Sequence, residues 1–588
     1  MILKRIYIKG FRNYKEATIN FEKNTLIIGA NDVGKTNLIY AIRLLLDRSF
    51  NDFALELKDT DYYAFEDTNE VIINAYFERV TDECVVARLG QYISDDGRMV
   101  IQYTSKKEGV SSEYQFRCGR TDSKDDLKDL DSPYYRKFLN IKYISSKRDL
   151  WNYINKSKNT LLERAKIERP SKDVENDDML YAEIGKRLKF VDENIPDLTY
   201  VKNATKVINT ELDKLSIHNR EQKIVFDTDY TDIDRMISNV SIASKHKDRR
   251  MIIGGDGRIN QIYLSLWATL NQPSEFTNEV SIICIEEPEA YLHPHQQREL
   301  ATYLGQKLEG QVMLTSHSPY IASEFSPNSI VRLYKTPKGN TKAASDGCSK
   351  IISDGFEDFG YRMSVIPAEA FYSDFAILVE GPSELMFYKT LANQLDIDLD
   401  RLNVSVMSVE GVGFKTYVEI LNALNIDWVL RTDNDILKIP KHDGYRYAGI
   451  ERGLTFMEMT WQIEDDDEKT IEKFKPLIHG FKDKDNISDE IKQAAEEIRK
   501  VLAKYYIQIA DDDLETDLYN SPLQDSLQKY YGSEKEKDVV GQMKDKKAIN
   551  MYDYLKKKKL DLRLLEGDRL AEPVMIAKRF IENRYGAY

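Results

Sequence analysis

A phosphate-binding loop at residues 29–36 constrains the fold of this chain more than any other feature. The sequence Gly-Ala-Asn-Asp-Val-Gly-Lys-Thr fits G-x-x-x-x-G-K-T; it follows a short apolar run and precedes a helical pattern of apolar residues. In such loops backbone N–H groups surround phosphate oxygens, the lysine neutralises the terminal phosphates and the threonine hydroxyl binds Mg²⁺. This order predicts an α/β nucleotide-binding domain. Its expected ligand residues are Gly29, Asn31, Gly34, Lys35, Thr36 and Asn37.

Two further segments predict the rest of a nucleotide site. Residues 280–289 form an apolar run that ends in carboxylates, typical of a buried parallel strand that holds Mg²⁺ at its end. Glu286 is the expected metal-side carboxylate, and Glu287 is the candidate base that orients water. The next apolar run, 312–315, delivers His317 to the same sheet edge, where a histidine can sense the γ-phosphate.

A glycine-rich turn at residues 254–258, Gly-Gly-Asp-Gly-Arg, precedes a segment whose apolar residues recur with helical spacing. A helix N-terminus behind such a turn presents free backbone N–H groups and a positive dipole end. The turn therefore predicts a second anion site, formed by Gly255, Asp256 and Gly257.

The motifs FRNY, GANDVGKT, GGDGR, IICIEEPEAYLHP and TSHSP, in this order, resemble the ABC-type ATPase heads of the SMC, Rad50 and RecF group. The resemblance implies that two heads bind head to tail, with the glycine-rich turn of one closing over the ATP held by the other. Two departures from the family pattern, Gly254 where serine is common and Glu286 where aspartate is usual, weaken the expectation of efficient ATP turnover. The combination suits nucleotide sensing better than motor work.

The order of motifs divides the chain. We expect the N-terminal half of an ATPase at 1–150, its C-terminal half at 246–350, and a different α/β domain at 365–588 with a helical insertion at about 461–505. Residues 151–245 lack the sustained heptads of a long coiled coil, and we expect them to form a compact helical insert used for dimerisation.

The C-terminal region carries acidic residues at successive predicted strand ends. The apolar run 375–379 leads into Glu380, a Gly-Pro turn and Glu384, and the run 428–432 leads into Asp433 and Asp435. Parallel strands bring such ends to one sheet edge, where converging carboxylates repel one another unless a cation neutralises them. Oxygen ligands favour Mg²⁺ or Mn²⁺.

The pattern V-E-G-x-x-E followed by D-x-D resembles the Toprim domain of topoisomerases, primases and OLD-family nucleases. By this resemblance Asp513 and Glu515 complete a site for two metal ions, and Lys547 offsets charge on the reacting phosphate. An ATPase head followed by Toprim is the OLD architecture, and the motifs are most similar to the nuclease subunits of Gabija anti-phage systems. That similarity implies that the protein binds ATP and double-stranded DNA. It also implies a homo-oligomer built from head-paired dimers, as a dimer of dimers, and a UvrD-like helicase partner.

The predicted function is an ATP-regulated, divalent-metal-dependent DNA endonuclease in anti-phage defence, inhibited when nucleotide binds the head. A non-cleaving, ATP-gated DNA clamp of the RecF type is the alternative, but it leaves the C-terminal acidic residues without a role. A net charge of −14 argues against nonspecific coating of nucleic acid without excluding a local basic groove. No apolar run approaches the length of a membrane span, so a cytoplasmic location is expected.

Overall fold

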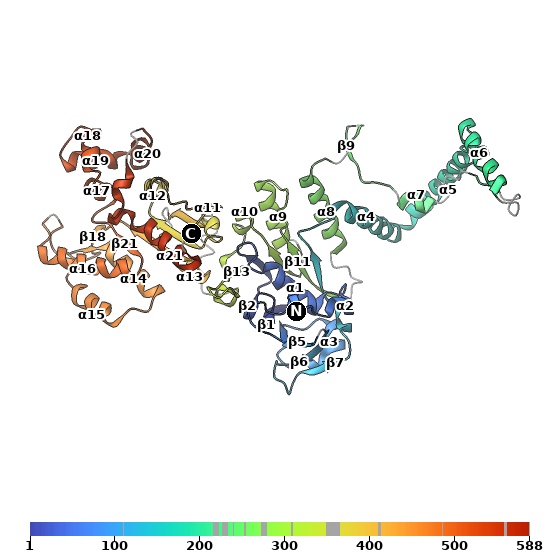
Figure 1. Cartoon of the computed structure of the whole chain (residues 1–588), viewed down its shortest axis with the longest axis horizontal. Coiled ribbons are helices and arrows are strands. Elements are labelled where there is room, and N and C mark those ends of the chain that lie inside the picture. Colours follow the sequence, from blue (N-terminus) through green and yellow to red (C-terminus); the bar gives the residue numbers. More distant parts are fainter. Residues whose placement is uncertain are drawn as a thin grey trace. The chain divides into compact units, whose positions relative to one another are not determined.

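The computed structural model describes most of the chain as two units (Figure 1). The described residues are 1–109, 111–215, 223–225, 233–238, 240–247, 249–251, 254–271, 279–306, 308, 310–348, 365–409, 413–484, 486–557 and 561–586. One unit comprises residues 1–146 and 276–588, and the other comprises residues 147–275. The ATPase and C-terminal regions therefore share one unit, and each unit is described by itself.

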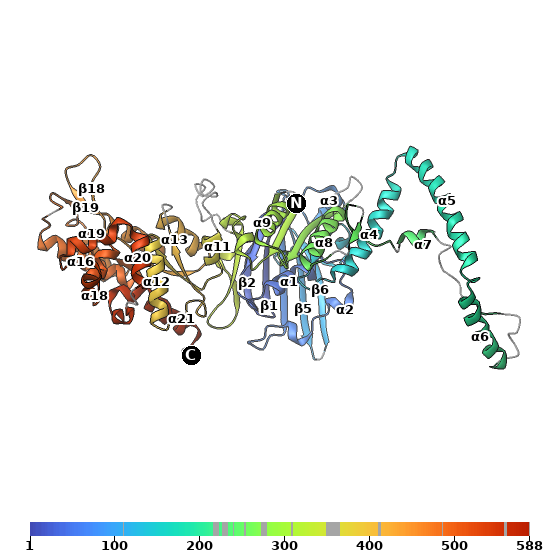
Figure 2. The same cartoon turned by 90° about the horizontal axis from the view of Figure 1, so that it is seen from above.

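Two six-stranded sheets build the ATPase region (Figure 2). The antiparallel sheet has the order β2-β1-β4-β5-β6-β7, with strands Tyr14–Asn20, Ile2–Phe11, Glu70–Glu78, Met99–Glu108, Ser111–Gly119 and Lys128–Leu130. The second has the order β14-β13-β3-β12-β11-β8, with strands Thr341–Ala343, Ile330–Lys335, Asn24–Ile28, Gln311–Thr315, Val280–Glu286 and Leu139–Ile144. All its pairings are parallel except that of β14 with β13.

The apolar runs of the sequence become the buried strands of the second sheet. All five residues of β12 are buried, as are the last four of β3, because a parallel sheet is covered on both faces. One core cluster joins the two sheets to α1 (Lys35–Leu46), whose inner face carries Leu38, Ile42 and Leu45. The remaining helices of this region are α2 (Asp52–Leu55), α3 (Glu83–Leu89), α9 (Pro294–Gln306) and α10 (Pro319–Ala322).

The unit 147–275 contains the predicted helical insert. Its helices are α4 (Leu150–Ile167), α5 (Ser171–Asn194), α6 (Thr199–Leu215), α7 (Ile233–Ser238) and α8 (Asp256–Asn271), with a two-stranded ribbon of β9 (Ser244–His246) and β10 (Arg249–Met251). α4 packs against α8, where the rings of Tyr153 and Tyr263 lie 4.4 Å apart. None of the 24 residues of α5 is buried among the residues that the structure describes.

The C-terminal region is built on a four-stranded parallel sheet of order β16-β15-β17-β21, with strands Val404–Ser408, Phe375–Val379, Asp427–Thr432 and Ile507–Ile509. A three-stranded antiparallel sheet, β18 (Ile436–Lys438), β19 (Tyr445–Tyr447) and β20 (His479–Phe481), lies in the long connection between β17 and β21. The helices are α11 (Val365–Ala370), α12 (Pro382–Gln394), α13 (Phe414–Ala423), α14 (Ala448–Thr460), α15 (Asp465–Phe474), α16 (Asp489–Lys504), α17 (Leu514–Tyr519), α18 (Gln524–Tyr531), α19 (Glu536–Asp545), α20 (Lys547–Lys557) and α21 (Glu572–Tyr585).

The segment 461–505, expected as a helical insertion, contributes to this fold. α16 buries Ala494, Ile498 and Leu502, and it contacts both α14 and β21. Its apolar residues recur at intervals of three and four, which places them on one helix face. The segment therefore covers the parallel sheet near its edge strand. No helix in the described part of the chain is long and apolar enough to cross a membrane.

Candidate functional site

The phosphate loop follows β3 and its backbone requires glycine at both ends. Gly29 and Gly34 have φ values of +146° and +108°. A Cβ on Gly29 would lie 2.5 Å from the carbonyl oxygen of Leu333, and one on Gly34 would lie 2.1 Å from Asn13 Nδ2. Side chains therefore cannot replace these hydrogens without moving the loop, because positive φ is unfavourable for them as well.

Lys35 points back into its own loop. Its Nζ donates to the carbonyl oxygens of Gly29 at 2.8 Å and Ala30 at 2.9 Å. Burial lowers the pKa of Lys35 to about 8, against the opposing effect of Glu287 and three other carboxylates. A triphosphate would supply the negative charge that restores the ordinary pKa of a lysine.

The other expected loop ligands have different surroundings. Asn31 and Thr36 are exposed, so both can reach a bound nucleotide. Asn37 instead donates to Asn13 Oδ1 at 2.6 Å and accepts from Arg12 Nη1 at 2.8 Å. This geometry uses Asn37 to fix the FRNY turn to the loop. In the sequence, only the family resemblance connects the FRNY turn with the phosphate loop.

Glu286, Glu287 and His317 lie at adjacent strand ends, as expected. Glu286 is buried at the end of β11 and accepts from the Tyr143 hydroxyl at 3.0 Å. Glu287 follows in the left-handed conformation, with φ of +45°, and its Oε1 lies 3.8 Å from His317 Nε2. Burial lowers the pKa of His317, with the nearby charge of Lys35 acting in the same direction. The three residues therefore lie together at the sheet edge where the nucleotide site is predicted, and their roles toward a nucleotide stay predictions.

Glu289 is a site residue that sequence reasoning missed. Its Oε1 accepts from Ser316 Oγ at 2.7 Å and from the backbone N–H of His317 at 2.8 Å. Burial raises the pKa of Glu289. The sequence offered one signal, a third carboxylate in the run Glu-Glu-Pro-Glu. Glu289 holds the backbone that presents His317.

Gly255, Asp256 and Gly257 lie at the start of α8, in the unit 147–275. Gly255 has φ of +81°, and no atom of the described residues lies within 4 Å of a Cβ built on it. The N-terminal end of this helix is therefore open to a ligand. Its expected contact with the nucleotide of a second head stays a prediction.

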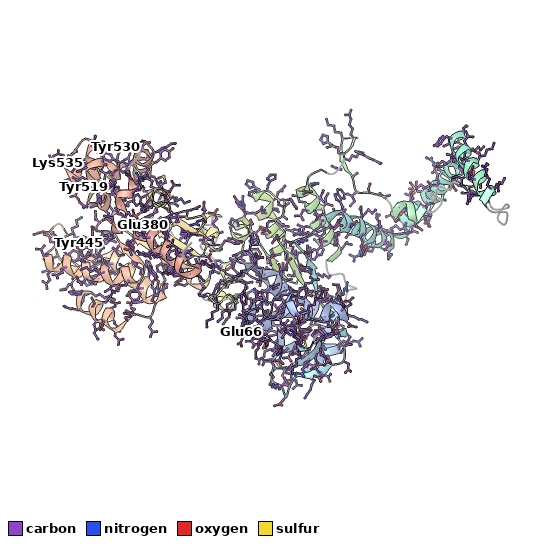
Figure 3. The ribbon with its side chains drawn as sticks, in the orientation of Figure 1. Glu66, Glu380, Tyr445, Tyr519, Tyr530 and Lys535 are labelled. Atoms are coloured by element: carbon purple, nitrogen blue, oxygen red, sulfur yellow. The ribbon has the colours of Figure 1, made fainter. Side chains whose placement is uncertain are left out.

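The Toprim carboxylates converge at the carboxyl ends of β15 and β17 (Glu380 is labelled in Figure 3). Glu380 Oε1 accepts from Thr432 Oγ1 at 2.5 Å and from the backbone N–H of Asp433 at 2.8 Å. Glu384 lies in the first turn of α12, where its Oε2 accepts from Gly381 N at 2.7 Å. The parallel pairing of the two strands thus brings residues distant in sequence to one edge.

Burial and mutual repulsion perturb two of these carboxyls. The pKa of Asp433 is raised to about 8, chiefly by burial and then by the charges of Glu380 and Glu384. Burial also raises the pKa of Glu384 to about 7, while the buried guanidinium of Arg431 opposes the rise. Carboxyl pKa values perturbed in this way cluster at functional sites.

The acidic motif after β21 joins the same edge, because Asn434 N donates to the carbonyl oxygen of Asp512 at 2.8 Å. Glu515, 1% exposed, lies 3.2 Å from Lys547 Nζ, which is itself 4.0 Å from Asp433 Oδ2. Asp513 serves as the N-cap of α17 and lies 2.5 Å from Lys544 Nζ. Although burial acts in the opposite direction, hydrogen bonds from Lys544 and Thr516 keep the pKa of Asp513 below its ordinary value.

These residues suit a divalent cation in their chemistry. The available donors are carboxylate oxygens, which hard cations prefer, and Asp433 Oδ1 is buried without a hydrogen-bond partner. Among the residues that the structure describes, no three His, Cys, Asp or Glu side chains lie close enough to hold a metal ion as they stand. Basic side chains stand between the carboxylates instead, as the pairs with Lys544 and Lys547 show.

Two arginines around this edge were missed in the sequence. Arg431, 3% exposed, lies 2.5 Å from the buried Asp517 and places a positive charge beneath the carboxylates. A charge inside the apolar strand 428–432 is a signal for it, because buried arginines are paired. Arg452, from α14, contacts Asp435 and Glu380. No spacing rule connects Arg452 to these residues, since strands and loops separate Arg452 from both of them in the chain.

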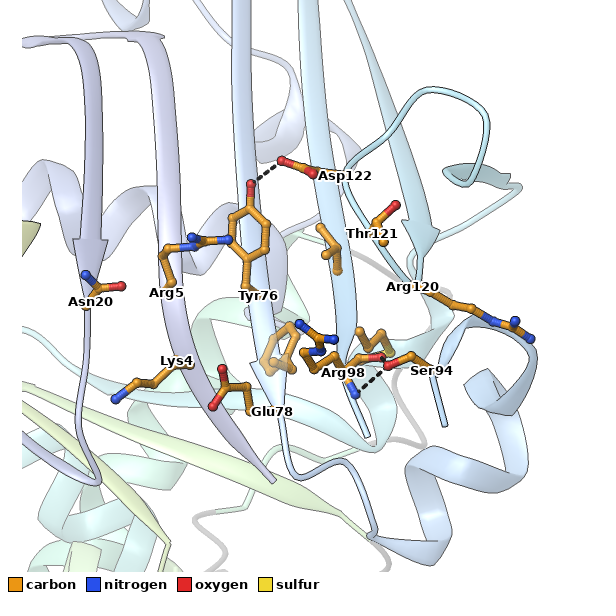
Figure 4. A pocket seen from close by; sticks show the side chains of 13 residues that line it. Lys4, Arg5, Asn20, Tyr76, Glu78, Ser94, Arg98, Arg120, Thr121 and Asp122 are labelled. Carbon is orange, nitrogen blue, oxygen red and sulfur yellow. Dashed lines mark hydrogen bonds between the residues drawn. The ribbon is translucent and has the colours of Figure 1, made fainter. Parts of the chain in front are cut away.

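A hollow of about 470 Å³ on the antiparallel ATPase sheet lies apart from both sites (Figure 4). Three of its cationic side chains, Lys4, Arg5 and Arg98, already have partners. Arg5 stacks over the Tyr76 ring at 4.0 Å, the Tyr76 hydroxyl donates to Asp122 at 2.7 Å, and Lys4 pairs with Glu22 at 2.5 Å. None of the predicted site residues lines this hollow.

Comparison with known proteins identifies two domain families in the chain. The model of the AAA ATPase domain matches residues 1–247 and 121–322, and the model of the Toprim domain of overcoming-lysogenization-defect-like (OLD-like) proteins matches residues 371–435. Endonuclease GajA of Bacillus cereus (strain VD045) is 24% identical over 585 residues, covering 94% of this chain and 95% of that protein.

Two further relatives cover most of the chain. The OLD nuclease of Thermus scotoductus is 22% identical over 74% of this chain and 83% of its own length. The Old nuclease of Escherichia phage P2 is 23% identical over 74% of this chain and 77% of its own length. The chain belongs to the AAA ATPase domain family and, with an OLD-like Toprim domain behind its ATPase, is an ATP-binding nuclease of the OLD family.

Proposed function

We propose that this OLD-family enzyme is a divalent-metal-dependent DNA endonuclease that bound nucleotide inhibits and that acts in anti-phage defence. One observation carries the chemical part. Carboxyls that follow three neighbouring parallel strands, β15, β17 and β21, gather with Lys547 at one sheet edge. The names of its relatives, endonuclease GajA and OLD nuclease, support the same reaction.

The proposed roles follow from position. Mg²⁺ or Mn²⁺, as two ions by the family pattern, would activate a water and stabilise the leaving 3′ oxygen when bound. Glu380, Asp433 and Asp435 would hold the cation, together with Glu384, Glu515 and, after release from Lys544, Asp513. Asp433 must lose its proton first, because its pKa is raised to about 8. Lys547 would offset negative charge on the reacting phosphate.

The ATPase site is proposed to act as the sensor. Lys35 is held by two loop carbonyls and is ready to exchange them for phosphate oxygens. His317 and Glu287 would report on the γ-phosphate, and Gly255 to Gly257 of a second head would close over it. A contact within the chain supports a route to the nuclease: the Tyr372 hydroxyl, just before β15, donates to the Ser318 carbonyl oxygen at 3.1 Å.

The insert is proposed to dimerise the enzyme. Met179, Phe190 and Tyr200 on α5 and α6 are 67%, 67% and 72% exposed. Apolar side chains along unburied helices favour association with another helix pair. A second copy of the insert is the proposed occupant, alongside the pairing of heads. Double-stranded DNA is the proposed substrate, and a UvrD-like helicase is a proposed partner that the relatives' family suggests.

Supercoiled plasmid incubated with the purified full-length protein and Mg²⁺ or Mn²⁺ tests the proposal. Nicked or linear product is expected, and Glu380→Ala or Asp433→Ala should remove it while nucleotide binding remains. Cleavage above roughly a tenth of wild type in both variants would place the active site elsewhere. Plasmid retention without cleavage by the wild type would favour a DNA clamp of the RecF type.

Lys35→Ala tests the sensor. The variant should lose triphosphate binding but keep cleavage without nucleotide, because the two sites share no residue. ATP should suppress wild-type cleavage by roughly 5- to 150-fold, the usual range of coupling between sites. Free Mg²⁺ must be held constant, since ATP chelates the metal. If ATP suppresses cleavage by Lys35→Ala as strongly as cleavage by the wild type, or if ATP accelerates cleavage, inhibition of the nuclease by nucleotide bound at this site is refuted.

A further inference from the structure

Arg452 extends from α14 into the Toprim carboxylates. Its Nη2 lies 3.1 Å from Asp435 Oδ2 and 3.5 Å from Glu380 Oε1. The same nitrogen lies 3.0 Å from Thr432 Oγ1 and 3.1 Å from the carbonyl oxygen of Asp433. One nitrogen thus has four oxygens around it, although its two N–H bonds cannot serve all four at once.

This arrangement is unlike an ordinary arginine salt bridge. Arginine pairs most strongly through two parallel hydrogen bonds to one carboxylate, and Arg452 makes no such pair. A compact charge surrounded by oxygens from two carboxylates, a hydroxyl and a carbonyl is what a divalent cation requires. The guanidinium therefore stands where the proposed cation would be needed.

The backbone beneath Arg452 is fixed. Ala448 N, at the start of α14, donates to the carbonyl oxygen of Asp435 at 2.8 Å. Gly449 packs so closely that a Cβ would lie 2.3 Å from the carbonyl oxygen of Asp433. Arg452 is three residues further along this helix and shares its face. Release from the carboxylates therefore requires a side-chain rotation and no movement of the helix.

A released guanidinium would face solvent beside the site. Arg452 is 37% exposed on its side chain, and the neighbouring Glu451 is already paired with Arg446 and His479. DNA bound at this edge would place a phosphate next to the released guanidinium. The planar N–H donors of arginine match the oxygens of a phosphate.

We propose that Arg452 competes with the catalytic divalent cation for Glu380 and Asp435 and, once displaced, binds a phosphate of the DNA beside the scissile bond. The inference rests on the proposed metal-dependent nuclease function. In the resting enzyme Arg452 neutralises the carboxylates and holds them apart. After displacement the same residue contributes to substrate positioning.

Mn²⁺ binding to the full-length, nucleotide-free protein tests the first half, measured by electron paramagnetic resonance. Arg452→Gln should bind Mn²⁺ roughly 2- to 30-fold more tightly, as expected for the loss of two exposed ion pairs. Arg452→Lys, which keeps the charge, should fall between the two. Arg446→Gln, which removes a neighbouring arginine paired only with Glu451, is the matched control and should match wild type.

Duplex DNA binding with Ca²⁺ tests the second half, measured by fluorescence anisotropy across salt concentrations. Arg452→Gln should bind DNA more weakly and lower the salt dependence by about one phosphate contact. Unchanged Mn²⁺ affinity in Arg452→Gln, while Glu380→Ala loses Mn²⁺, would overturn the inference and leave the proposed function standing. Wild-type Mn²⁺ affinity in Glu380→Ala would refute the proposed metal site itself. DNA binding and salt dependence equal to wild type would overturn the phosphate-binding role.

Discussion

Replacement of Arg332 by methionine should uncouple the ATPase region from the Toprim region. Arg332, 4% exposed, extends from β13 and donates to the carbonyl oxygens of four C-terminal residues. The distances are 3.2 Å to Phe371, 2.7 Å to Ser373, 3.1 Å to Leu424 and 3.0 Å to Asn425. Asp374 lies 3.6 Å away as the counter-ion.

The magnitude follows from what the substitution leaves behind. Methionine fills a similar volume but donates no hydrogen bond, so four carbonyl oxygens and one carboxylate lose a donor at a buried junction. Breaking a buried pair from one side costs about 3–5 kcal/mol. We therefore expect the free energy of unfolding of the Toprim region to fall by that amount, which is roughly a hundredfold or more in the unfolding equilibrium.

Tryptophan fluorescence during urea unfolding is a suitable assay. Trp428 and Trp461 belong to the Toprim region, and the chain's other tryptophans, Trp151 and Trp267, lie in the unit 147–275 and would be replaced by phenylalanine for this assay. Lys335→Met, at an exposed cation on the same strand, is the control and should shift stability by less than about 0.5 kcal/mol. If Arg332→Met lowers the free energy of unfolding by less than about 1 kcal/mol, water replaces the guanidinium as the donor and the junction is not dry.

Further predictions concern the nucleotide site and its route to the nuclease. Tyr372→Phe, which removes one hydrogen bond to Ser318, should weaken ATP suppression roughly 2- to 10-fold with unchanged nucleotide-free cleavage; equal suppression would exclude this route. Gly29→Ala should abolish triphosphate binding in equilibrium dialysis, because its Cβ would lie 2.5 Å from the Leu333 carbonyl oxygen. Since Lys35 has a pKa of about 8, ATP binding at pH 8.5 should take up protons, and calorimetry in two buffers should find less uptake at pH 7, where Lys35 is already largely protonated.

The parts of both sites that follow apolar strands could be predicted from the sequence. A buried parallel strand is a continuous apolar run, and its carboxyl end is where an α/β sheet binds ligands. The positions of Lys35, His317, Glu380 and Asp433 followed from that rule. The order of the strands determines which strand ends are neighbours. Because β15 pairs with β17, Glu380 reaches the backbone N–H of Asp433.

The basic residues around the carboxylates could not be predicted in the same way. Arg452 and Lys544 lie on helices whose placement depends on tertiary packing, and helical periodicity specifies a face but not its neighbour. Asn37 is a residue whose side-chain partner could not be predicted from its place in the motif. Its place next to the phosphate loop predicts a nucleotide ligand, whereas its side chain binds Asn13, because the first turn of α1 is packed against the FRNY turn.

Two of the hydrogen-bonded contacts between the ATPase and Toprim regions come from strands on opposite sides of the phosphate loop. β3 carries the loop, and its neighbours in the sheet are β13, which bears Arg332, and β12, which leads to Ser318. Both contacts reach the segment 371–374, directly ahead of β15 and Glu380. A change in the strand ends around a γ-phosphate would therefore act on one short segment from two points. Because β15 lies inside its sheet, that segment can shift Glu380 only by moving the paired strand or by changing the turn at Gly381, and small changes of that kind would alter the geometry of the proposed metal ligands.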